Sequence, residues 1–157
     1  MGTTFRIYLP CGEESCAVGE HDLARKSVQP GSETILLVED QEDVRGFARE
    51  ALRSNGYQVI DAASGIEAMG LSAGYPGVIH MMITDVVMPE MDGRELADQL
   101  KIQRPEMKVL FMSGYTADVI VRRGIADNVV GLLPKPFSQA ALAGKVREVL
   151  AGPERAS

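Results

Sequence analysis

Residues 81–93 read MMITDVVMPEMDG, an apolar run that ends at Asp85 and then turns through a Met-Pro and an Asp-Gly pair. Met81, Met82 and Ile83 are typical of a buried strand. An ionised aspartate at the edge of a protein core is costly unless another group compensates its charge. We therefore expect residues from other parts of the chain to meet Asp85 at the end of this strand.

The same alternation of an apolar run and a helical pattern occurs five times after residue 33. The predicted strands are residues 34–40, 57–62, 78–85, 107–113 and 129–135, and the predicted helices are residues 43–56, 64–73, 93–103, 116–124 and 138–150. Such an alternation on short connections forms βαβ units and a parallel sheet covered on both faces. The predicted fold class is α/β, a flavodoxin-like doubly wound sheet of five parallel strands in the order 2-1-3-4-5, with five helices.

Ligands of these sheets bind outside the carboxyl ends of the strands, near the switch point between the first and third strands. Five candidate site residues end the predicted strands: Glu39, Asp40, Asp85, Ser113 and Lys135. Three crowded carboxylates repel one another, and at least one would take up a proton unless a cation neutralises them. Mg²⁺ prefers oxygen ligands and typically uses one or two carboxylates, so the pattern predicts Mg²⁺ as a cofactor.

Lys135 and Ser113 add a positive charge and a hydrogen-bond donor for an anion beside the metal. Positioning and charge neutralisation carry most of the catalysis of phosphoryl transfer, so this set of groups suits that reaction. Asp85 is central among them and is the expected nucleophile, which would become an aspartyl phosphate.

Each of these residues also has a structural interpretation. Asp40 could cap the helix that follows it, and Asp92 could cap the helix that begins at residue 93. Ser113 alone could be a turn residue and Lys135 a surface lysine. The presence of all five candidates at the same end of successive strands favours the functional interpretation.

The segments LLVED, MMITDVVMPEMDG, VLFMSGY and LLPKPF together resemble the receiver (response-regulator) domain of two-component signalling, over about residues 33–152. The resemblance implies that Asp85 receives a phosphoryl group from the phosphohistidine of a histidine kinase or histidine phosphotransfer protein, and that the domain then switches conformation. It also implies that Asp40, Asp85 and the backbone carbonyl of Val87 bind Mg²⁺, with Glu39 in contact through water. A degenerate receiver that binds proteins without phosphotransfer is the alternative, and the intact set of site residues argues against it.

By the same resemblance, Ser113 contacts the phosphoryl group, and Lys135 contacts both the carboxylate and the phosphoryl oxygens. A cis peptide is expected between Lys135 and Pro136. Leu132 departs from the pattern, because receivers usually carry an aromatic residue there that moves with the hydroxyl group. Tyr115 offers a nearby ring that could partly shield the site.

Residues 2–10, GTTFRIYLP, resemble the last glycine-box segment and closing strand of a histidine-kinase ATPase domain. This implies that the chain is the C-terminal part of a hybrid histidine kinase. We expect a kinase remnant at residues 1–10, a flexible linker at 11–32, the receiver at 33–152 and a tail at 153–157. The receiver itself would catalyse only its own phosphorylation and dephosphorylation, whereas the full-length protein would be a histidine kinase.

The composition, with 45% hydrophobic and 24% charged residues among 157, suits one globular domain. The net charge of −6 argues against direct binding to nucleic acid. No apolar run approaches the roughly 18 residues of a membrane span, and no signal peptide opens the chain. Cys11 and Cys16 fit free thiols, so we expect a cytoplasmic protein. We also expect a monomer or weak dimer. His21 and His80 are isolated and are not expected to be catalytic.

Two classes of enzyme share the predicted fold. A flavodoxin needs a phosphate-binding loop after the first strand, and the acidic segment VEDQEDVRG at residues 38–46 would repel the flavin phosphate. Phosphatases with an aspartate nucleophile usually carry an Asp-x-Asp motif at this position. The corresponding residues here are Asp40, Gln41 and Glu42, which lack the second aspartate.

Overall fold

The structure is a computed structural model that describes residues 31–114 and 131–152. Its strands are β1 (Thr34–Val38), β2 (Gln58–Ala62), β3 (Met81–Asp85), β4 (Lys108–Ser113) and β5 (Gly131–Pro134). All pair in parallel, in the order β2-β1-β3-β4-β5. This confirms the predicted flavodoxin-like topology.

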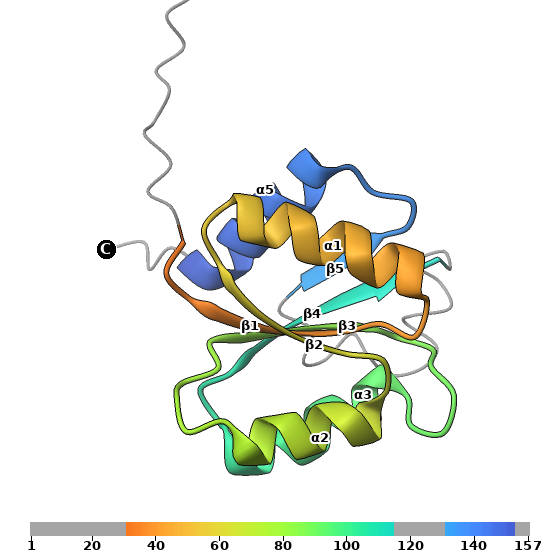
Figure 1. Cartoon of the computed structure of the whole chain (residues 1–157), viewed down its shortest axis with the longest axis vertical. Coiled ribbons are helices and arrows are strands. Elements are labelled where there is room, and N and C mark those ends of the chain that lie inside the picture. The colour runs from red at the N-terminus through yellow and green to blue at the C-terminus, as the bar shows by residue number, and fades with distance from the viewer. Residues whose placement is uncertain (1–30, 115–130, 153–157) are drawn as a thin grey trace, which may run out of the picture.

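The helices are α1 (Glu42–Ser54), α2 (Gly65–Gly74), α3 (Gly93–Gln103) and α5 (Gln139–Ala151). Helices α1 and α5 cover one face of the sheet, and α2 and α3 cover the other (Figure 1). The helix predicted at residues 116–124 lies outside the described residues.

Two hydrophobic clusters fill the layers on either side of the sheet. Alternate residues of one strand belong to different clusters: Leu36 packs with the residues of α2 and α3, and Leu37 with those of α1 and α5. The side chains of β1 are fully buried from Ile35 to Val38, because helices cover both faces of this central strand. Strands β1 and β3, two of the three inner strands, therefore hold the residues at their ends in fixed positions.

The helix starts decide between the two interpretations of the acidic residues. Asp92 caps α3, because its Oδ1 accepts a hydrogen bond from the N–H of Glu95 (2.8 Å). The N-cap of α1 is Gln41, whose side chain makes no capping bond. The alternative in which Asp40 caps this helix is therefore wrong.

Strand β3 begins at Met81, three residues later than predicted. The cause is His80, whose Nδ1 accepts the N–H of Thr34 (3.0 Å). An imidazole thus takes the place of a strand carbonyl, and the β1–β3 ladder starts only at the pair of Ile35 and Met81.

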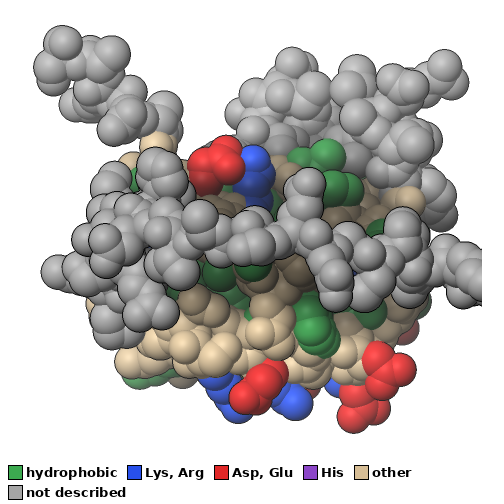
Figure 2. Space-filling view, turned by 90° about the horizontal axis from the view of Figure 1, so that it is seen from above, with side chains coloured by type: hydrophobic (Ala, Val, Ile, Leu, Met, Phe, Trp, Pro, Cys, Tyr) green, Lys and Arg blue, Asp and Glu red, His purple; other side chains and the backbone are tan. Residues whose placement is uncertain are grey.

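The described surface mixes charges of both signs with apolar side chains. Seen from above, acidic and basic groups lie next to one another at the rim and hydrophobic side chains show between them (Figure 2). The exposed large hydrophobic side chains among the described residues are Phe47, Ile66, Leu71, Val78, Val87 and Ile102. Among the described helices, none combines the length and apolar character that a bilayer span requires.

Candidate functional site

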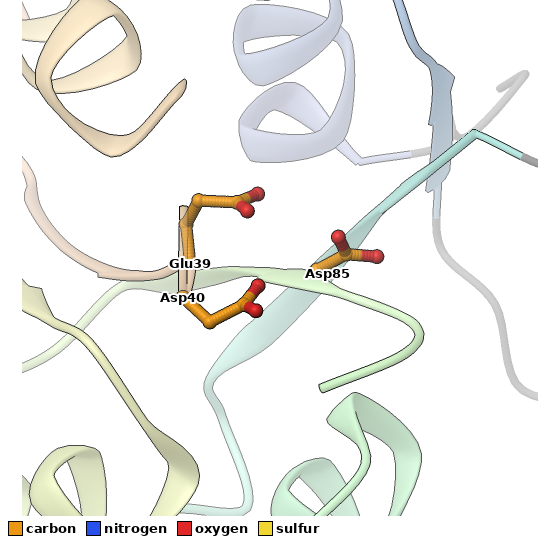
Figure 3. Close-up of side chains that lie close together, drawn as sticks. All are labelled: Glu39, Asp40 and Asp85. Carbon is orange, nitrogen blue, oxygen red and sulfur yellow. The ribbon is translucent and has the colours of Figure 1, made fainter. Parts of the chain in front are cut away.

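Three carboxylates meet where β1 and β3 end. Glu39 and Asp40 directly follow β1, and Asp85 is the last residue of β3, its parallel neighbour. One oxygen from each carboxylate lies within 4.8 Å of the other two, and the three groups gather at this edge of the sheet (Figure 3). Glu39 is buried, Asp85 is partly buried and Asp40 is exposed, so the cluster runs from the core to the solvent.

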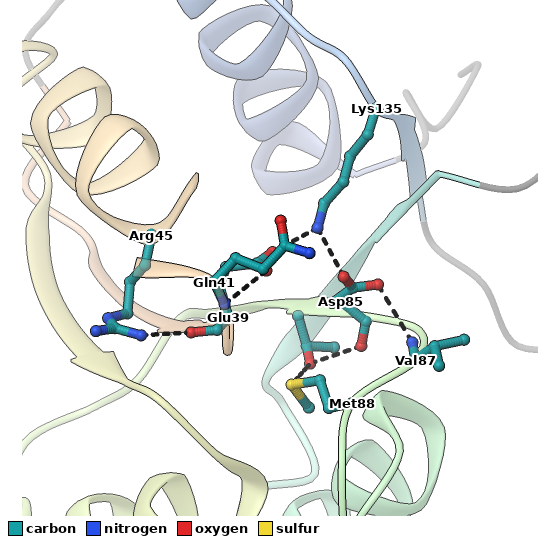
Figure 4. Close-up of polar contacts among 8 residues, drawn as sticks. Glu39, Gln41, Arg45, Asp85, Val87, Met88 and Lys135 are labelled. Carbon is teal, nitrogen blue, oxygen red and sulfur yellow. Dashed lines mark hydrogen bonds and ion pairs between the residues drawn. The ribbon is translucent and has the colours of Figure 1, made fainter. Parts of the chain in front are cut away.

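Lys135 extends into this cluster from the segment between β5 and α5. Its Nζ donates to Oε2 of Glu39 and to Oδ2 of Asp85, at 2.6 Å in both cases (Figure 4). One ammonium therefore faces three carboxylates, a formal excess of two negative charges. Hard oxygen donors with that excess charge fit a divalent cation such as Mg²⁺.

Burial and charge act on the ionisation of both partners. Burial raises the pKa of Glu39 above its ordinary value; the hydrogen bond and the charge of Lys135 lower it again, and Asp85 raises it further. For Lys135, burial lowers the pKa, but the hydrogen bonds and charges of Asp85 and Glu39 outweigh burial, and the pKa is raised. The lysine is therefore a permanent positive charge in the site.

Ser113 ends β4, the strand on the other side of β3, and is buried. Its backbone carbonyl accepts a hydrogen bond from the N–H of Lys135 (2.7 Å). The two residues predicted to contact an anion are thus joined through the backbone, at the same edge of the sheet as Asp85.

The turn after β3 is built closely around Asp85. The N–H of Val87 donates to Oδ1 of Asp85 (3.2 Å), and Oγ1 of Thr84 donates to its backbone carbonyl (3.1 Å). A Cβ atom on Gly93 would lie 2.0 Å from that same carbonyl oxygen. Only glycine allows the start of α3 to approach the end of β3 this closely.

The sequence interpretation missed two contacts to Glu39. The N–H of Gln41 donates to its Oε1 (3.2 Å), and Nη1 of Arg45 donates to its backbone carbonyl (2.7 Å). Arg45 is a basic residue near the start of a helix, where acidic residues are favoured, and this was the only signal in the sequence.

A shallow groove adjoins the site, between the start of α1 and the segment after β5. Its volume is about 430 Å³, and it is lined by Gln41, Asp43, Val44, Phe47, Lys135, Pro136 and Phe137. The rings of Phe47 and Phe137 lie 6.1 Å apart at its apolar end.

Comparison with known proteins agrees with this geometry. The sequence model of the response regulator receiver domain matches residues 35–147. The chain belongs to this family. It is therefore a receiver domain of two-component signalling, as its motifs indicated.

This chain is similar to two proteins of Brucella abortus (strain 2308), and it spans nearly all of one but a small part of the other. The response regulator receiver protein CpdR is 34% identical over 116 residues, which are 74% of this chain and 95% of CpdR. The sensor kinase CckA is 42% identical over 156 residues, which cover 95% of this chain but only 16% of the kinase.

Solved structures show the same fold. The receiver domain of the hybrid histidine kinase CckA is 35% identical, with a TM-score of 0.63, over 74% of this chain and 98% of that domain. The chemotaxis response regulator CheY4 of Vibrio cholerae is 27% identical, with a TM-score of 0.68, over 76% of this chain and 99% of CheY4.

Two further expectations from the family pattern concern this receiver domain's last strand. The peptide between Lys135 and Pro136 is cis, as expected. Leu132, at the usual aromatic position, lies opposite Phe111 of β4. It packs against the hydrophobic cluster between the sheet and helices α2 and α3. Tyr115 lies outside the described residues.

Proposed function

We propose that this receiver domain takes a phosphoryl group onto Asp85 from a phosphohistidine, in a Mg²⁺-dependent reaction, and later loses it to water. The observation that supports this most strongly is the position of the Lys135 ammonium, 2.6 Å from carboxylate oxygens of both Asp85 and Glu39. A fixed cation beside a nucleophilic carboxylate is what phosphoryl transfer requires, because charge develops on the transferred group.

Four residues would hold the metal. Asp40 and Asp85 would bind Mg²⁺ through their carboxylates, Val87 through its backbone carbonyl, and Glu39 through water. Bound Mg²⁺ would neutralise negative charge on the phosphoryl oxygens. The cluster supports this assignment because its oxygens are close together and carry more negative charge than Lys135 neutralises.

The transfer forms one bond to phosphorus and breaks another. An oxygen of Asp85 attacks the phosphorus, an O–P bond forms, the P–N bond of the phosphohistidine breaks, and the imidazole leaves with the electron pair. Lys135 balances the charge on the phosphoryl oxygens, and the hydroxyl of Ser113 donates a hydrogen bond to one of them. In the later hydrolysis, the oxygen of a water molecule attacks the phosphorus and forms a new O–P bond, and the O–P bond to Asp85 breaks. The carboxylate of Asp85 and inorganic phosphate are released, and the protons of the water stay with the phosphate or pass to solvent.

We also propose that the chain is part of a hybrid sensor kinase, with residues 1–10 and 11–32 as its kinase remnant and linker. The similarity to CckA supports this, because it covers 95% of the chain, whereas the receiver family matches only residues 35–147. We place the domain in the cytoplasm, as a monomer or weak dimer that contacts no nucleic acid directly. The gene sequence upstream of residue 1 tests the proposal: a histidine-kinase ATPase domain supports it, and its absence overturns it.

Phosphorylation of the intact chain tests the main proposal. The protein is incubated with acetyl phosphate and Mg²⁺ and followed by mass spectrometry, and beryllofluoride with backbone NMR reports the conformational response. We expect one phosphoryl group per chain, dependent on Mg²⁺ and absent in Asp85→Asn. Labelling of Asp85→Asn to the same stoichiometry would contradict the proposed acceptor.

A further inference from the structure

Arg45 contacts the metal-binding segment without belonging to the carboxylate cluster. It lies on the first turn of α1, and its Nη1 donates to the backbone carbonyl of Glu39 at 2.7 Å (Figure 4). Only 15% of its side chain is exposed. Side chains on a helix point toward its N-terminus, so this guanidinium can reach back over six residues to the end of β1.

The position of this guanidinium is unfavourable unless something compensates it. The N-terminus of a helix carries a partial positive charge, which repels a cation. Asp61 on β2 provides the compensation, because its Oδ2 lies 3.7 Å from Nε of Arg45. The same oxygen accepts a hydrogen bond from Nη1 of Arg49 (2.8 Å). Asp61 thus links two arginines of α1 to the sheet, and only Arg45 also contacts Glu39.

The contact with Glu39 controls the direction of one peptide plane. The carbonyl of Glu39 and the N–H of Asp40 belong to the same planar group, so the orientation of one decides that of the other. On the preceding side, the N–H of Glu39 donates to the carbonyl of Ala62 (3.1 Å). The backbone that leads into Asp40 is therefore held by β2 on one side and by Arg45 on the other.

Asp40 depends on this backbone more than the other two acids do. Lys135 holds both Glu39 and Asp85 by their carboxylates. The Asp40 side chain is exposed, and within residues 31–114 and 131–152 no hydrogen bond or ion pair to its carboxylate is present. Its position at the metal site follows from the orientation of its backbone.

We propose that Arg45 is a positioning residue for Mg²⁺ binding, which orients the peptide between Glu39 and Asp40 so that Asp40 faces the metal. This inference rests on the Mg²⁺ site of the proposed function. Residues that orient metal ligands typically change metal affinity by about 10–100-fold when they are replaced.

Charge and position predict opposite effects of removing Arg45. A cation near a divalent metal repels it, so loss of the guanidinium charge alone would tighten Mg²⁺ binding. Loss of the positioning contact would weaken it. The sign of the change in affinity therefore separates the two.

The experiment uses the full 157-residue chain and measures its Mg²⁺ dissociation constant by calorimetry and by NMR titration. Arg45→Met should raise the dissociation constant about tenfold. The matched control, Arg49→Met, removes a cation that pairs with the same Asp61 but does not contact Glu39, and its dissociation constant should stay within about twofold of wild type or fall. Without metal, the Asp40 amide resonance should shift in Arg45→Met and stay in place in Arg49→Met.

The possible outcomes separate the metal site from the role of Arg45. A wild-type chain that does not bind Mg²⁺ contradicts the metal site itself and, with it, this inference. A wild-type chain that binds, with unchanged or tighter binding in Arg45→Met, overturns only the role of Arg45. Equal weakening in both arginine variants also overturns it. If Arg45→Met does not fold, Arg45→Lys decides, because lysine keeps the charge but cannot contact Glu39 and Asp61 together; a wild-type dissociation constant in that variant overturns the inference.

Discussion

The two edges of the sheet use partly buried cations in different ways. At the edge where the strands begin, Arg104 donates four hydrogen bonds, to the hydroxyl and carbonyl of Ser72 and to the carbonyls of Tyr75 and Gly77, at 2.8 to 3.0 Å. At the edge where the strands end, Lys135 faces three carboxylates and leaves an excess of negative charge.

The difference lies in what each cation leaves unsatisfied. The acceptors of Arg104 are all neutral. Those of Ser72 lie in the last turn of α2 and those of Tyr75 and Gly77 in the α2–β3 connection, so this contact joins the end of α3 to both. The acceptors of Lys135 are charged, and in the proposed function they exchange partners with a metal or a phosphoryl group. We therefore expect one edge to contribute mainly to stability and the other to the proposed binding of Mg²⁺, and substitutions should separate the two properties.

Replacement of Arg104 should have the largest effect on stability. Arg104→Met removes the donor of four hydrogen bonds, each worth about 1.5–3 kcal/mol when the donor is charged. All four are only partly buried, so water can replace the guanidinium at several of the acceptors and the loss should be well below their sum. We expect a loss of about 3 kcal/mol in the free energy of unfolding, measured by urea denaturation, with the Mg²⁺ affinity unchanged. The control Lys101→Met removes a cation from the last turn of the same helix and should cost much less. Equal costs in the two variants would contradict the role given to Arg104.

Replacement of Asp40 should have the reverse effect. Asp40→Asn should raise the Mg²⁺ dissociation constant by at least about tenfold, because an amide is a poorer ligand for this ion. Its stability without metal should not fall, since one of three crowded charges is removed. Asp43→Asn is the matched control, because it removes an exposed charge from the adjacent turn, outside the cluster. NMR titration of both variants measures the difference; equal affinities would remove Asp40 from the metal site.

The hydrogen bonds of Arg104 and the cluster of polar residues around Lys135 could not be predicted equally well from the sequence. The strand order and the meeting of Glu39, Asp85, Ser113 and Lys135 were predictable, because parallel strands bring their ends to one edge whatever the details of packing. The hydrogen bonds of Arg104 were not. They join residues 27 to 32 positions apart along the chain, and only the folded loop decides which carbonyls a long side chain reaches.

The misassigned boundary has a comparable cause. Periodicity predicted a strand from residue 78, since Val78 and Ile79 are apolar. The imidazole of His80 replaces a backbone acceptor of Thr34, and a side-chain contact of this kind leaves no trace in hydrophobic patterning.

The ionisation of Glu39, at the edge where the strands end, should make the stability of the protein depend on pH. Its pKa is raised in the folded state above the ordinary value of 4.5, mainly by burial. At pH values between the pKa of Glu39 in the unfolded chain and its higher pKa in the folded protein, the folded protein holds more protons than the unfolded chain. Stability without metal therefore falls as pH rises through this interval. Glu39→Gln cannot ionise and should lose this dependence.

Urea denaturation in a chelator, from pH 4 to pH 7, measures this effect. The stability of Glu39→Gln relative to wild type should increase as pH rises. Glu42→Gln removes an exposed carboxylate from the first turn of α1, outside the cluster, and is the control for the loss of a charge. A difference between Glu39→Gln and wild type that is constant with pH would show that burial of Glu39 does not control the dependence.

The smallest expected effect concerns backbone strain at the same two edges. The turn after α1 places Gly56 at a φ of 90°, where glycine is unstrained, whereas the turn after β3 places Glu90 at a φ of 68°. The N–H of Met91 donates to the carbonyl of Pro89 (2.8 Å) across Glu90, so the strained residue closes a tight turn close to Val87. The left-handed conformation destabilises the folded state by about 1–2 kcal/mol when the residue has a side chain. Glycine avoids this strain, but its greater freedom in the unfolded chain lowers the stability by about 0.4–1 kcal/mol. Glu90→Gly should therefore stabilise the protein by about 0.5 kcal/mol in urea denaturation. Glu90→Ala removes the same charge but keeps the strain, and an equal gain in that control would assign the effect to charge at the acidic edge rather than to the turn.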